Sequence, residues 1–157
     1  EVTESETSVE MTRAEIDAFL SQVILARLAT VRVDGRPHVT PIWFIWDGET
    51  IWMETGPDFV KARNLRDNPE CAVVVDTTEG GLRIKGVILE GRAELVQEPN
   101  DLVTRVVTRL YERYMGSEAM QAATPRKMFD APHVLIKLTP RTIISWDWTH
   151  QGIAPLL

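Results

Sequence analysis

Two Asp-Gly turns between short runs of β-forming residues restrict the fold of this chain more than any other feature of its sequence. Asp-Gly is a strong hairpin signal, and it occurs at residues 34–35 and 47–48. The turns separate three runs rich in aliphatic, β-branched or aromatic residues: 24–33, 38–46 and 50–55. Strands joined by tight turns are antiparallel, because a parallel pair needs a long crossover connection. The sequence therefore predicts an antiparallel meander rather than a parallel βαβ sheet.

The rest of the chain adds three strands to this prediction. They are expected at residues 71–76, 82–96 and 134–148, with Pro140 interrupting the last one. Within the long run 82–96, Gly86 and Gly91 are candidate bulge positions. Six strands that are mostly joined by tight turns predict a small antiparallel barrel, because closure is a common way to remove the exposed edges of such a sheet.

Three helices are expected at the margins of this sheet. Capping-box spacing between Thr12 and Glu15 starts the first, over about residues 12–22. Asp58 is a plausible cap for the second, over about 59–68. Apolar residues at three- and four-residue steps predict the third, between Pro99 and Gly116, and the segment that follows to Pro132 has no clear pattern. The predicted class is therefore mainly β, with flanking helices.

Length and charge exclude several kinds of partner. The chain has 157 residues, enough for one domain, and a net charge of −6. Four of its acids lie in the first ten residues, so the remainder is nearly balanced and lacks the basic footprint of a nucleic-acid binder. No apolar run approaches the roughly 20 residues that span a membrane. We interpret residues 1–11 as a flexible acidic leader and 12–157 as a single domain. The single cysteine, Cys71, cannot form an internal disulfide, which favours a reducing, cytoplasmic location.

Several common reactive sites have no support in the sequence. His38, His133 and His150 are far apart and form no HxxxH pair, so structural or surface roles are the simpler interpretation and no metal site is expected. Cys71 begins an apolar strand and is expected to be an inert, buried thiol. No nucleophile-elbow, Walker or GxGxxG motif is present.

A candidate anion site follows the third predicted strand. Thr55 and Gly56 precede a helix whose first amides point back toward them, and free N–H groups at a helix start favour an anion. Lys61, near the first turn, is the favoured cation, with Thr55 supplying a hydroxyl. Arg63 lies about 200° further around the helix and faces a different direction. The alternative is a solvated helix with ordinary surface cations.

Pro41 marks the second predicted strand as unusual. Proline cannot donate to a sheet ladder, so this strand must have an edge or a gap there. A planar ligand along the strand would then take the unpaired carbonyls and amides of Val39, Thr40 and Ile42. Aromatic residues are dense on the same segment and its neighbour, and core or subunit interface is the simpler interpretation of them: Trp43, Phe44, Trp46 and Trp52.

Three stretches carry a resemblance to a known family: LATVRVDGRPHVTPIWFIWDG, WMETGPDFVKARNLRDNPECAVVVD and GVILEGRAELV. The most specific part is KARNLRDNP after a strand that ends in Thr-Gly, and ERYMG and the terminal SWD strengthen it. Over residues 12–148 the chain resembles the pyridoxamine-phosphate-oxidase-like split-barrel superfamily. Within that superfamily it is most similar to the flavin- and deazaflavin-dependent oxidoreductases of actinobacteria.

This resemblance implies a six-stranded antiparallel split barrel of the FMN-binding type, which forms a homodimer with two cofactor sites at its interface. The tricyclic ring would lie along residues 39–43, the ribityl chain near Glu54 and Thr55, and the phosphate at Lys61. Trp146 would approach the ring edge, from its own or the other subunit. The cofactor-binding residues expected are therefore Val39, Thr40, Pro41, Ile42, Trp43, Glu54, Thr55, Lys61, Arg63 and Trp146. A dimer also suits the apolar surface of the long helix, the tryptophan-rich strands and the final residues 153–157.

One departure from the FMN oxidase pattern bears on the cofactor. Val60-Lys61 stands where that pattern commonly has Arg-Lys, and lysine cannot replace a bidentate arginine at a phosphate. This favours a deazaflavin coenzyme of the F-420 type, whose phosphate is a diester of lower charge, over FMN.

Three hypotheses about function follow. The leading one is a reductase that uses reduced deazaflavin coenzyme as hydride donor to an unsaturated or conjugated small-molecule acceptor, with no catalytic side chain identified. The second is an FMN-dependent oxidoreductase on the same barrel. The third is a non-catalytic protein that binds flavin, deazaflavin or haem, and the haem version requires His38 or His133 as an iron ligand.

Overall fold

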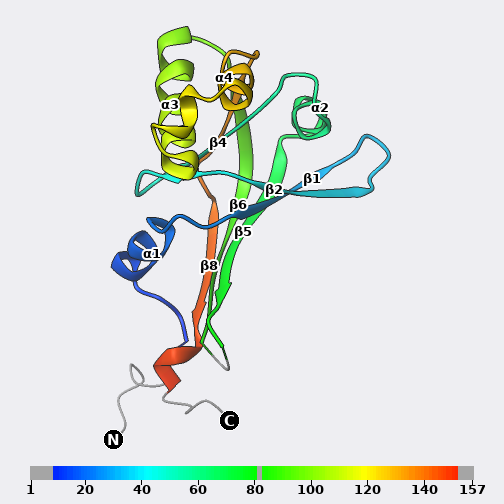
Figure 1. The fold of residues 1–157 in the computed structure, drawn as a ribbon. Coiled ribbons are helices and arrows are strands. Elements are labelled where there is room, and N and C mark those ends of the chain that lie inside the picture. Colours follow the sequence, from blue (N-terminus) through cyan, green and yellow to red (C-terminus); the bar gives the residue numbers. More distant parts are fainter. Residues whose placement is uncertain (1–8, 81–82, 152–157) are drawn as a thin grey trace, which may run out of the picture.

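Both Asp-Gly turns form hairpins in the computed structural model, which describes residues 9–80 and 83–151 (Figure 1). The turn glycines have positive φ angles, 84° at Gly35 and 98° at Gly48, which glycine adopts at little cost. The first turn joins β1 (Ala26–Val31) to β2 (Pro37–Ile42), and the second joins β3 (Ile45–Trp46) to β4 (Ile51–Thr55). All ladders between the described strands are antiparallel, which confirms the predicted meander.

The remaining elements follow the predicted order. The other strands are β5 (Glu70–Thr78), β6 (Ile84–Val96), β7 (Val134–Leu138) and β8 (Thr142–Asp147). The α-helices are α1 (Arg13–Leu20), α2 (Val60–Asp67), α3 (Asn100–Met115) and α4 (Ala123–Phe129), and short 3₁₀ turns occupy Ala119–Gln121 and Trp148–Gln151. The segment for which the sequence gave no clear pattern therefore contains α4. In the described part of the chain, no helix combines the length and apolar character needed to cross a bilayer.

The sheet curls into a half-barrel, and the two ends of its pairing order are consecutive strands of the chain. The strand order is β2-β1-β5-β6-β7-β4-β3. Its two ends, β2 and β3, are consecutive in sequence and separated only by Trp43 and Phe44. The second predicted strand thus pairs with β1 through its first half and with β4 through its second half. This confirms the mainly β, six-stranded split-barrel prediction. It also places Pro41 on an edge of the pairing order, as its missing N–H requires.

The longest strand, β6, pairs with two strands along one edge. Its first half pairs with β8 and its second half with β7, and the register shifts by one residue between them, around Pro140. The bulges expected in β6 at Gly86 and Gly91 are wrong, because its pairing with β5 is continuous over residues 84–92. Gly86 instead leaves room for an indole: a Cβ there would lie 2.1 Å from Cζ2 of Trp146.

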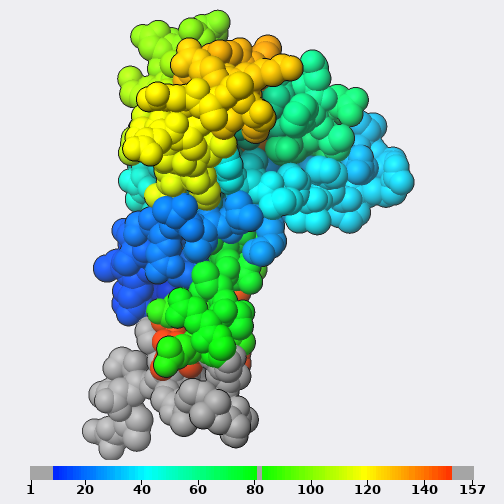
Figure 2. Space-filling model, viewed as in Figure 1, coloured from blue at the N-terminus to red at the C-terminus, as the bar shows by residue number. Residues whose placement is uncertain are grey.

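A three-stranded arm extends from the barrel, away from α3 and α4 (Figure 1). We define this arm as β8, the part of β6 that pairs with it (residues 85–90) and the facing part of β5 (residues 72–77). In the space-filling view, the β1–β2 hairpin and α2 form a lobe to one side of α3 and α4 (Figure 2). The molecule is therefore a barrel with one helical end and one extended strand end.

Two apolar clusters hold these parts together. The larger fills the barrel and continues onto the arm, and side chains of alternating strand positions are fully buried in it, among them Phe44, Met53 and Leu89. Each such side chain stabilises the fold by about 1.5–3 kcal/mol. The smaller cluster lies between α3 and the barrel and includes Leu110 and Tyr111.

Tyr114 of α3 stabilises the break between β2 and β3. Its hydroxyl donates to the Ile24 carbonyl at 2.7 Å and accepts from the Phe44 amide at 3.2 Å. Without it that amide, at a point where the strand pairing is interrupted, would lose its partner. Through this residue, α3 holds the segment between β2 and β3 in place.

The helix starts test the capping predictions. Thr12 and Glu15 form the predicted capping box at α1. The prediction of Asp58 as the cap of α2 is wrong: the cap position is Phe59, and no side chain caps this helix. The predicted leader, residues 1–11, lies outside the described residues except for its last three. There Met11 is buried, its amide donates to Ser145 Oγ at 3.0 Å, and the Val9 carbonyl accepts from the Asp147 amide.

Candidate functional site

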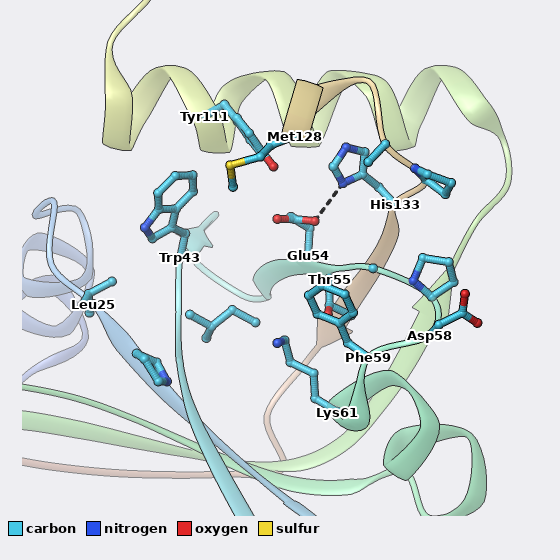
Figure 3. Close-up of a pocket in the computed structure, with 16 residues that line it drawn as sticks. Leu25, Trp43, Glu54, Thr55, Asp58, Phe59, Lys61, Tyr111, Met128 and His133 are labelled. Carbon is cyan, nitrogen blue, oxygen red and sulfur yellow. Dashed lines mark hydrogen bonds and ion pairs between the residues drawn. The ribbon is translucent and has the colours of Figure 1, made fainter. Parts of the chain in front are cut away.

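A cavity of about 620 Å³ lies at the helical end of the barrel, enclosed by the end of β2, the end of β4, the start of α2, and α3 (Figure 3). Tyr111 of α3 and residues 131–133, which follow α4, complete its wall. The lining residues are Leu25, Pro41, Ile42, Trp43, Glu54, Thr55, Gly56, Pro57, Asp58, Phe59, Lys61, Tyr111, Met128, Ala131, Pro132 and His133. Most of them are apolar, so the few polar groups stand out as recognition points.

One end of the cavity is cationic. Lys61, the second residue of α2, is half-buried, and its Nζ lies 5.3 Å from the centre of the Phe59 ring. Burial lowers the pKa of Lys61, and the negative charge of Glu54 opposes that shift. Among the residues described here, no carboxylate lies within ion-pair distance of this ammonium. Lys61 is therefore available to an anionic ligand.

Two buried polar atoms near this end lack partners. Thr55 is 3% exposed, and its hydroxyl has no hydrogen bond within the described structure. The same holds for Nδ1 of His38 on β2. Burial lowers the pKa of His38, and the charges of Arg32 and Lys61 lower it further. Unpaired buried polar atoms are costly, so a ligand that supplied partners here would gain affinity.

The opposite wall carries a buried acid–base pair, Glu54 and His133. His133 Nδ1 lies 2.9 Å from Glu54 Oε2, and His133 Nε2 lies 2.8 Å from the Phe129 carbonyl oxygen. Their side chains are only 12% and 17% exposed for His133 and Glu54, respectively. The hydrogen bond to Glu54 raises the pKa of His133, and burial opposes that shift. A carbonyl oxygen can only accept, so Nε2 carries a proton, and a second proton taken up by the ring lies between Nδ1 and the carboxylate.

An aromatic wall lies beside this pair. The Trp43 ring stacks on Tyr114, with centroids 5.0 Å apart, and meets Tyr111 edge-on at 5.4 Å. Burial and the negative charge of Glu54 raise the pKa of Tyr111 to about 12, so its hydroxyl stays protonated. The wall offers a flat apolar face to a ligand.

Six of the ten predicted site residues line this cavity: Pro41, Ile42, Trp43, Glu54, Thr55 and Lys61. The other four do not. Val39 is 67% exposed on the outer part of β2, and Thr40 precedes the cavity on the same strand. Arg63 is exposed on α2. Trp146 packs over Gly86 on the arm.

The other aromatic residues of this region have structural partners. Phe44 is fully buried in the core. The indole N–H of Trp46 donates to Asp17 at 2.8 Å, and that of Trp52 donates to Asp47 at 2.9 Å. The structural interpretation is therefore correct for these three residues, while Trp43 alone of the four lines the cavity. Cys71 is also inert as predicted, since burial raises the pKa of its thiol to about 11.

Sequence reasoning missed the residues that approach from the far end of the chain. His133 was interpreted as structural, and Tyr111, Phe59 and Met128 were not considered for the site. His133 immediately precedes β7, and its place at the site follows from how β7 pairs. Because that strand pairs with β4 so that Val134 faces Thr55, His133 lies close to Glu54.

The side chains around the cavity fit a flat, largely apolar group with an anionic end. The Trp43 side offers the aromatic face, and Lys61 with the unpartnered Thr55 hydroxyl offers a cation and a donor. Among the described residues that line the cavity there is no arginine, so Lys61 is the cation at this end.

Comparison with known proteins agrees with this geometry. The family model described as pyridoxamine 5′-phosphate oxidase matches residues 12–147. The solved structure of the conserved hypothetical protein Rv2991 from Mycobacterium tuberculosis is 32% identical, with a TM-score of 0.81, over 96% of this chain and 94% of that chain. A structure described as an F420 reductase is 28% identical, with a TM-score of 0.65, over 82% of this chain and 94% of that chain. The structure of an FAD and heme binding protein from Mycobacterium smegmatis is 22% identical, with a TM-score of 0.70, over 90% of this chain and 73% of that chain. At this identity the similarity supports a shared fold and nothing more.

Proposed function

Because the chain belongs to the pyridoxamine 5′-phosphate oxidase family, we propose that it is a reductase that uses a reduced deazaflavin coenzyme as hydride donor to a conjugated small-molecule acceptor. The similarity to an F420 reductase supports the choice of coenzyme. Membership of the family supports only a flavin-type oxidoreductase, so the choice of coenzyme rests on the residues of the cavity.

The observation that carries the proposal is the make-up of the anion-binding end. It holds one ammonium, Lys61, one unpartnered hydroxyl, Thr55, and no arginine among the lining residues. A phosphodiester carries one negative charge, which a single lysine can balance. The terminal phosphate of FMN is close to a dianion and is better matched by a bidentate arginine.

Each part of the cavity has a role in this proposal. Lys61 and Thr55 would hold the phosphate, and Pro41, Ile42 and Trp43 would lie along the ring. When bound, the reduced coenzyme supplies a hydride, and the protein supplies position and exclusion of water. The apolar lining and the covering helix α3 keep bulk water from the acceptor.

A side-by-side titration tests the choice of coenzyme. The protein is purified from a host that makes no deazaflavin, and its fluorescence is followed with oxidised deazaflavin coenzyme and with FMN. We expect colourless protein and tighter binding of the deazaflavin coenzyme. A yellow preparation with stoichiometric flavin, or tighter binding of FMN, would overturn the proposal in favour of an FMN-dependent oxidoreductase.

The haem alternative is less well supported by the side chains. Both ring nitrogens of His133 are already hydrogen-bonded, so His133 offers no free nitrogen to iron. His38 is not among the residues that line the cavity. A haemin titration without a Soret shift would exclude this alternative, and saturable coenzyme binding without turnover on any acceptor would favour a storage protein.

We propose, in addition, that the working form is a homodimer. Large exposed apolar side chains near the cavity and on the arm support it: Leu25, Val39, Phe59 and Ile144 are 44–67% exposed. In such a dimer, Trp146 of one subunit would approach the cavity of the other. Sedimentation of a monomer at micromolar concentration would contradict the dimer.

A further inference from the structure

We propose that the Glu54–His133 pair is the proton donor of the reaction, which rests on the reductase function proposed above. Reduction of a conjugated acceptor requires a hydride and a proton. The coenzyme supplies the first, and the sequence offered no donor for the second. The pair lies in the wall of the same cavity, where Figure 3 shows the Glu54 carboxylate between Trp43 and His133.

The hydrogen bonds around His133 define the proton that is available. Nε2 donates to the Phe129 carbonyl at 2.8 Å and is held by it. The proton between Nδ1 and Glu54 Oε2, at 2.9 Å, is the one that can leave. Since the carboxylate also faces the cavity, a group bound there can receive this proton through Glu54 without any movement of the ring.

The balance of the step is simple. The hydride adds to one end of the conjugated system of the acceptor, and the electron pair that it displaces collects at the other end, on oxygen for a quinone or an enone. The shared proton bonds to that atom, which leaves neutral imidazole beside an ionised Glu54. The acceptor has then gained two electrons and two hydrogens, and the coenzyme is oxidised.

In this proposal the proton is restored from the side of a second cavity. A smaller cavity of about 230 Å³ lies against the start of α3, and His133, Ala131 and Pro132 line both cavities. Its other lining residues include Gln97, Asn100, Thr104 and Asp130, which are polar. His133 thus separates an apolar reaction cavity from a polar one, and a proton from water can reach the ring from the polar side.

Several charged or titratable groups lie around the pair. Glu54 of β4 stabilises the imidazolium, and Tyr111 of α3, whose ring is 6.0 Å from His133, remains neutral. Lys61 of α2 and Asp58 before it share the main cavity. At the other side, Asp130 lines the polar cavity with His133, and its charge is balanced by Arg126 at 3.1 Å.

The first test uses the protein without coenzyme. The ring of His133 is followed by NMR across pH, with the assignment taken from its loss in H133Q. We expect a pKa above the ordinary value of 6.5, and a fall of that pKa in E54Q. The matched control is E94Q, which removes the carboxylate of another strand glutamate, 3.4 Å from Lys137 on the neighbouring strand. An unchanged titration in E54Q would overturn the pairing.

The second test measures reduction of menadione by reduced deazaflavin coenzyme in a stopped-flow instrument. A general acid contributes about 10²–10⁴-fold, so we expect E54Q and H133Q to reduce the rate of acceptor reduction at saturating coenzyme about 100-fold or more. The coenzyme dissociation constant of H133Q should stay within about threefold of wild type. In wild type the rate should fall as pH rises through the pKa measured by NMR, and should show a solvent deuterium isotope effect. E94Q should behave as wild type.

The outcomes separate this inference from the function on which it rests. Wild type that does not oxidise the coenzyme with any acceptor would overturn the reductase proposal and the donor role with it. Active wild type with an equally active H133Q of unchanged pH profile would overturn the donor role alone. A reduced rate in both variants, measured at saturating coenzyme and at a temperature at which each variant is folded, supports it.

Discussion

The arm and the cavity are built on the same sheet, but their buried polar groups are satisfied in different ways. On the arm, Asp147 is 3% exposed, and its carboxylate accepts from the Thr149 amide and hydroxyl and pairs with Lys85 at 3.2 Å. At the cavity, the Thr55 hydroxyl, equally buried, has no partner within the described structure. The buried polar group on the arm finds its partners within the chain, and the one at the cavity would find a partner in a ligand.

This difference shows where to look for function in the fold. Buried donors and acceptors are nearly always paired in native proteins, so unpaired ones need an explanation. Of the three such atoms in the described structure, Thr55 Oγ1 lines the cavity, and His38 Nδ1 belongs to a ring close enough to Lys61 for that charge to lower its pKa. The third, Arg113 Nε, belongs to a residue that does not line it.

The largest effect is expected from removing the cation of the cavity. Lys61→Ala should raise the dissociation constant of the deazaflavin coenzyme about tenfold or more, because a hydrogen bond to a charged group contributes about 1.5–3 kcal/mol. Fluorescence titration measures it. Arg63→Ala, on the same helix but exposed and outside the cavity, is the matched control and should bind as wild type. Equal affinities for K61A and wild type would place the phosphate elsewhere.

On the arm, the largest effect is expected at Gly86. A methyl group there would overlap the Trp146 indole, so Gly86→Ala should destabilise the protein by about 1–3 kcal/mol, the usual cost of overpacking. Urea unfolding measures this free energy. In a Trp146→Ala background the same substitution should cost close to nothing, because the indole is gone. The same cost in both backgrounds would show that the indole is not what excludes a side chain.

The sequence predicted the fold well because the fold depends on local signals. The Asp-Gly turns, the capping box of Thr12 and Glu15, and the helical apolar period before Gly116 each act within a few residues, and each is confirmed. The errors in the fold come from contacts between distant segments. Gly86 was interpreted as a bulge because the sequence does not show that Trp146 lies opposite.

The cavity was predicted only in part, for the same reason. Pro41, Thr55 and Lys61 lie within one stretch of the chain whose pattern indicates a ligand. The acid–base pair joins residues 54 and 133, which meet only because β7 pairs with β4 in a given register. The covering residue Tyr111 comes from a helix whose apolar stripe is equally suited to a plain core. Register and helix placement are set by the whole fold and leave no local signal.

A smaller effect is expected from the unpaired hydroxyl itself. A buried hydroxyl without a partner costs about 1–3 kcal/mol, so Thr55→Val, which keeps the shape, should stabilise the coenzyme-free protein by up to about 1 kcal/mol. The control is Thr50→Val, because the Thr50 hydroxyl is bonded to that of Thr139 at 2.7 Å and its loss should destabilise by about 1 kcal/mol. Thermal unfolding measures both. Loss of stability in T55V similar to that in T50V would mean that the Thr55 hydroxyl has a partner.

The smallest expected effect is on how the stability of the fold depends on pH, which should change in opposite directions for the cavity and for the arm. The pKa of His133 is raised by Glu54, so this pair stabilises the fold fully below about pH 6.5 and loses that contribution as pH rises through the raised pKa. For Asp147, burial alone would raise the pKa, but the hydrogen bonds from Thr149 and the charge of Lys85 outweigh it and lower the pKa. The stabilisation from Asp147 is therefore present above about pH 3.8 and is lost as pH falls through the lowered pKa.

The corresponding variants should therefore respond to pH in opposite ways. The destabilisation caused by His133→Gln should be largest near pH 5.5 and shrink toward pH 9. That caused by Asp147→Asn should be constant from pH 6 to 9 and shrink toward pH 3, with a size of about 1 kcal/mol or less because Lys85 is partly exposed. Urea unfolding at a series of pH values measures both. If the free energy lost in His133→Gln were the same at every pH between 5.5 and 9, the ring would take up no extra proton in this range. The cavity would then show no pH dependence there, like the arm.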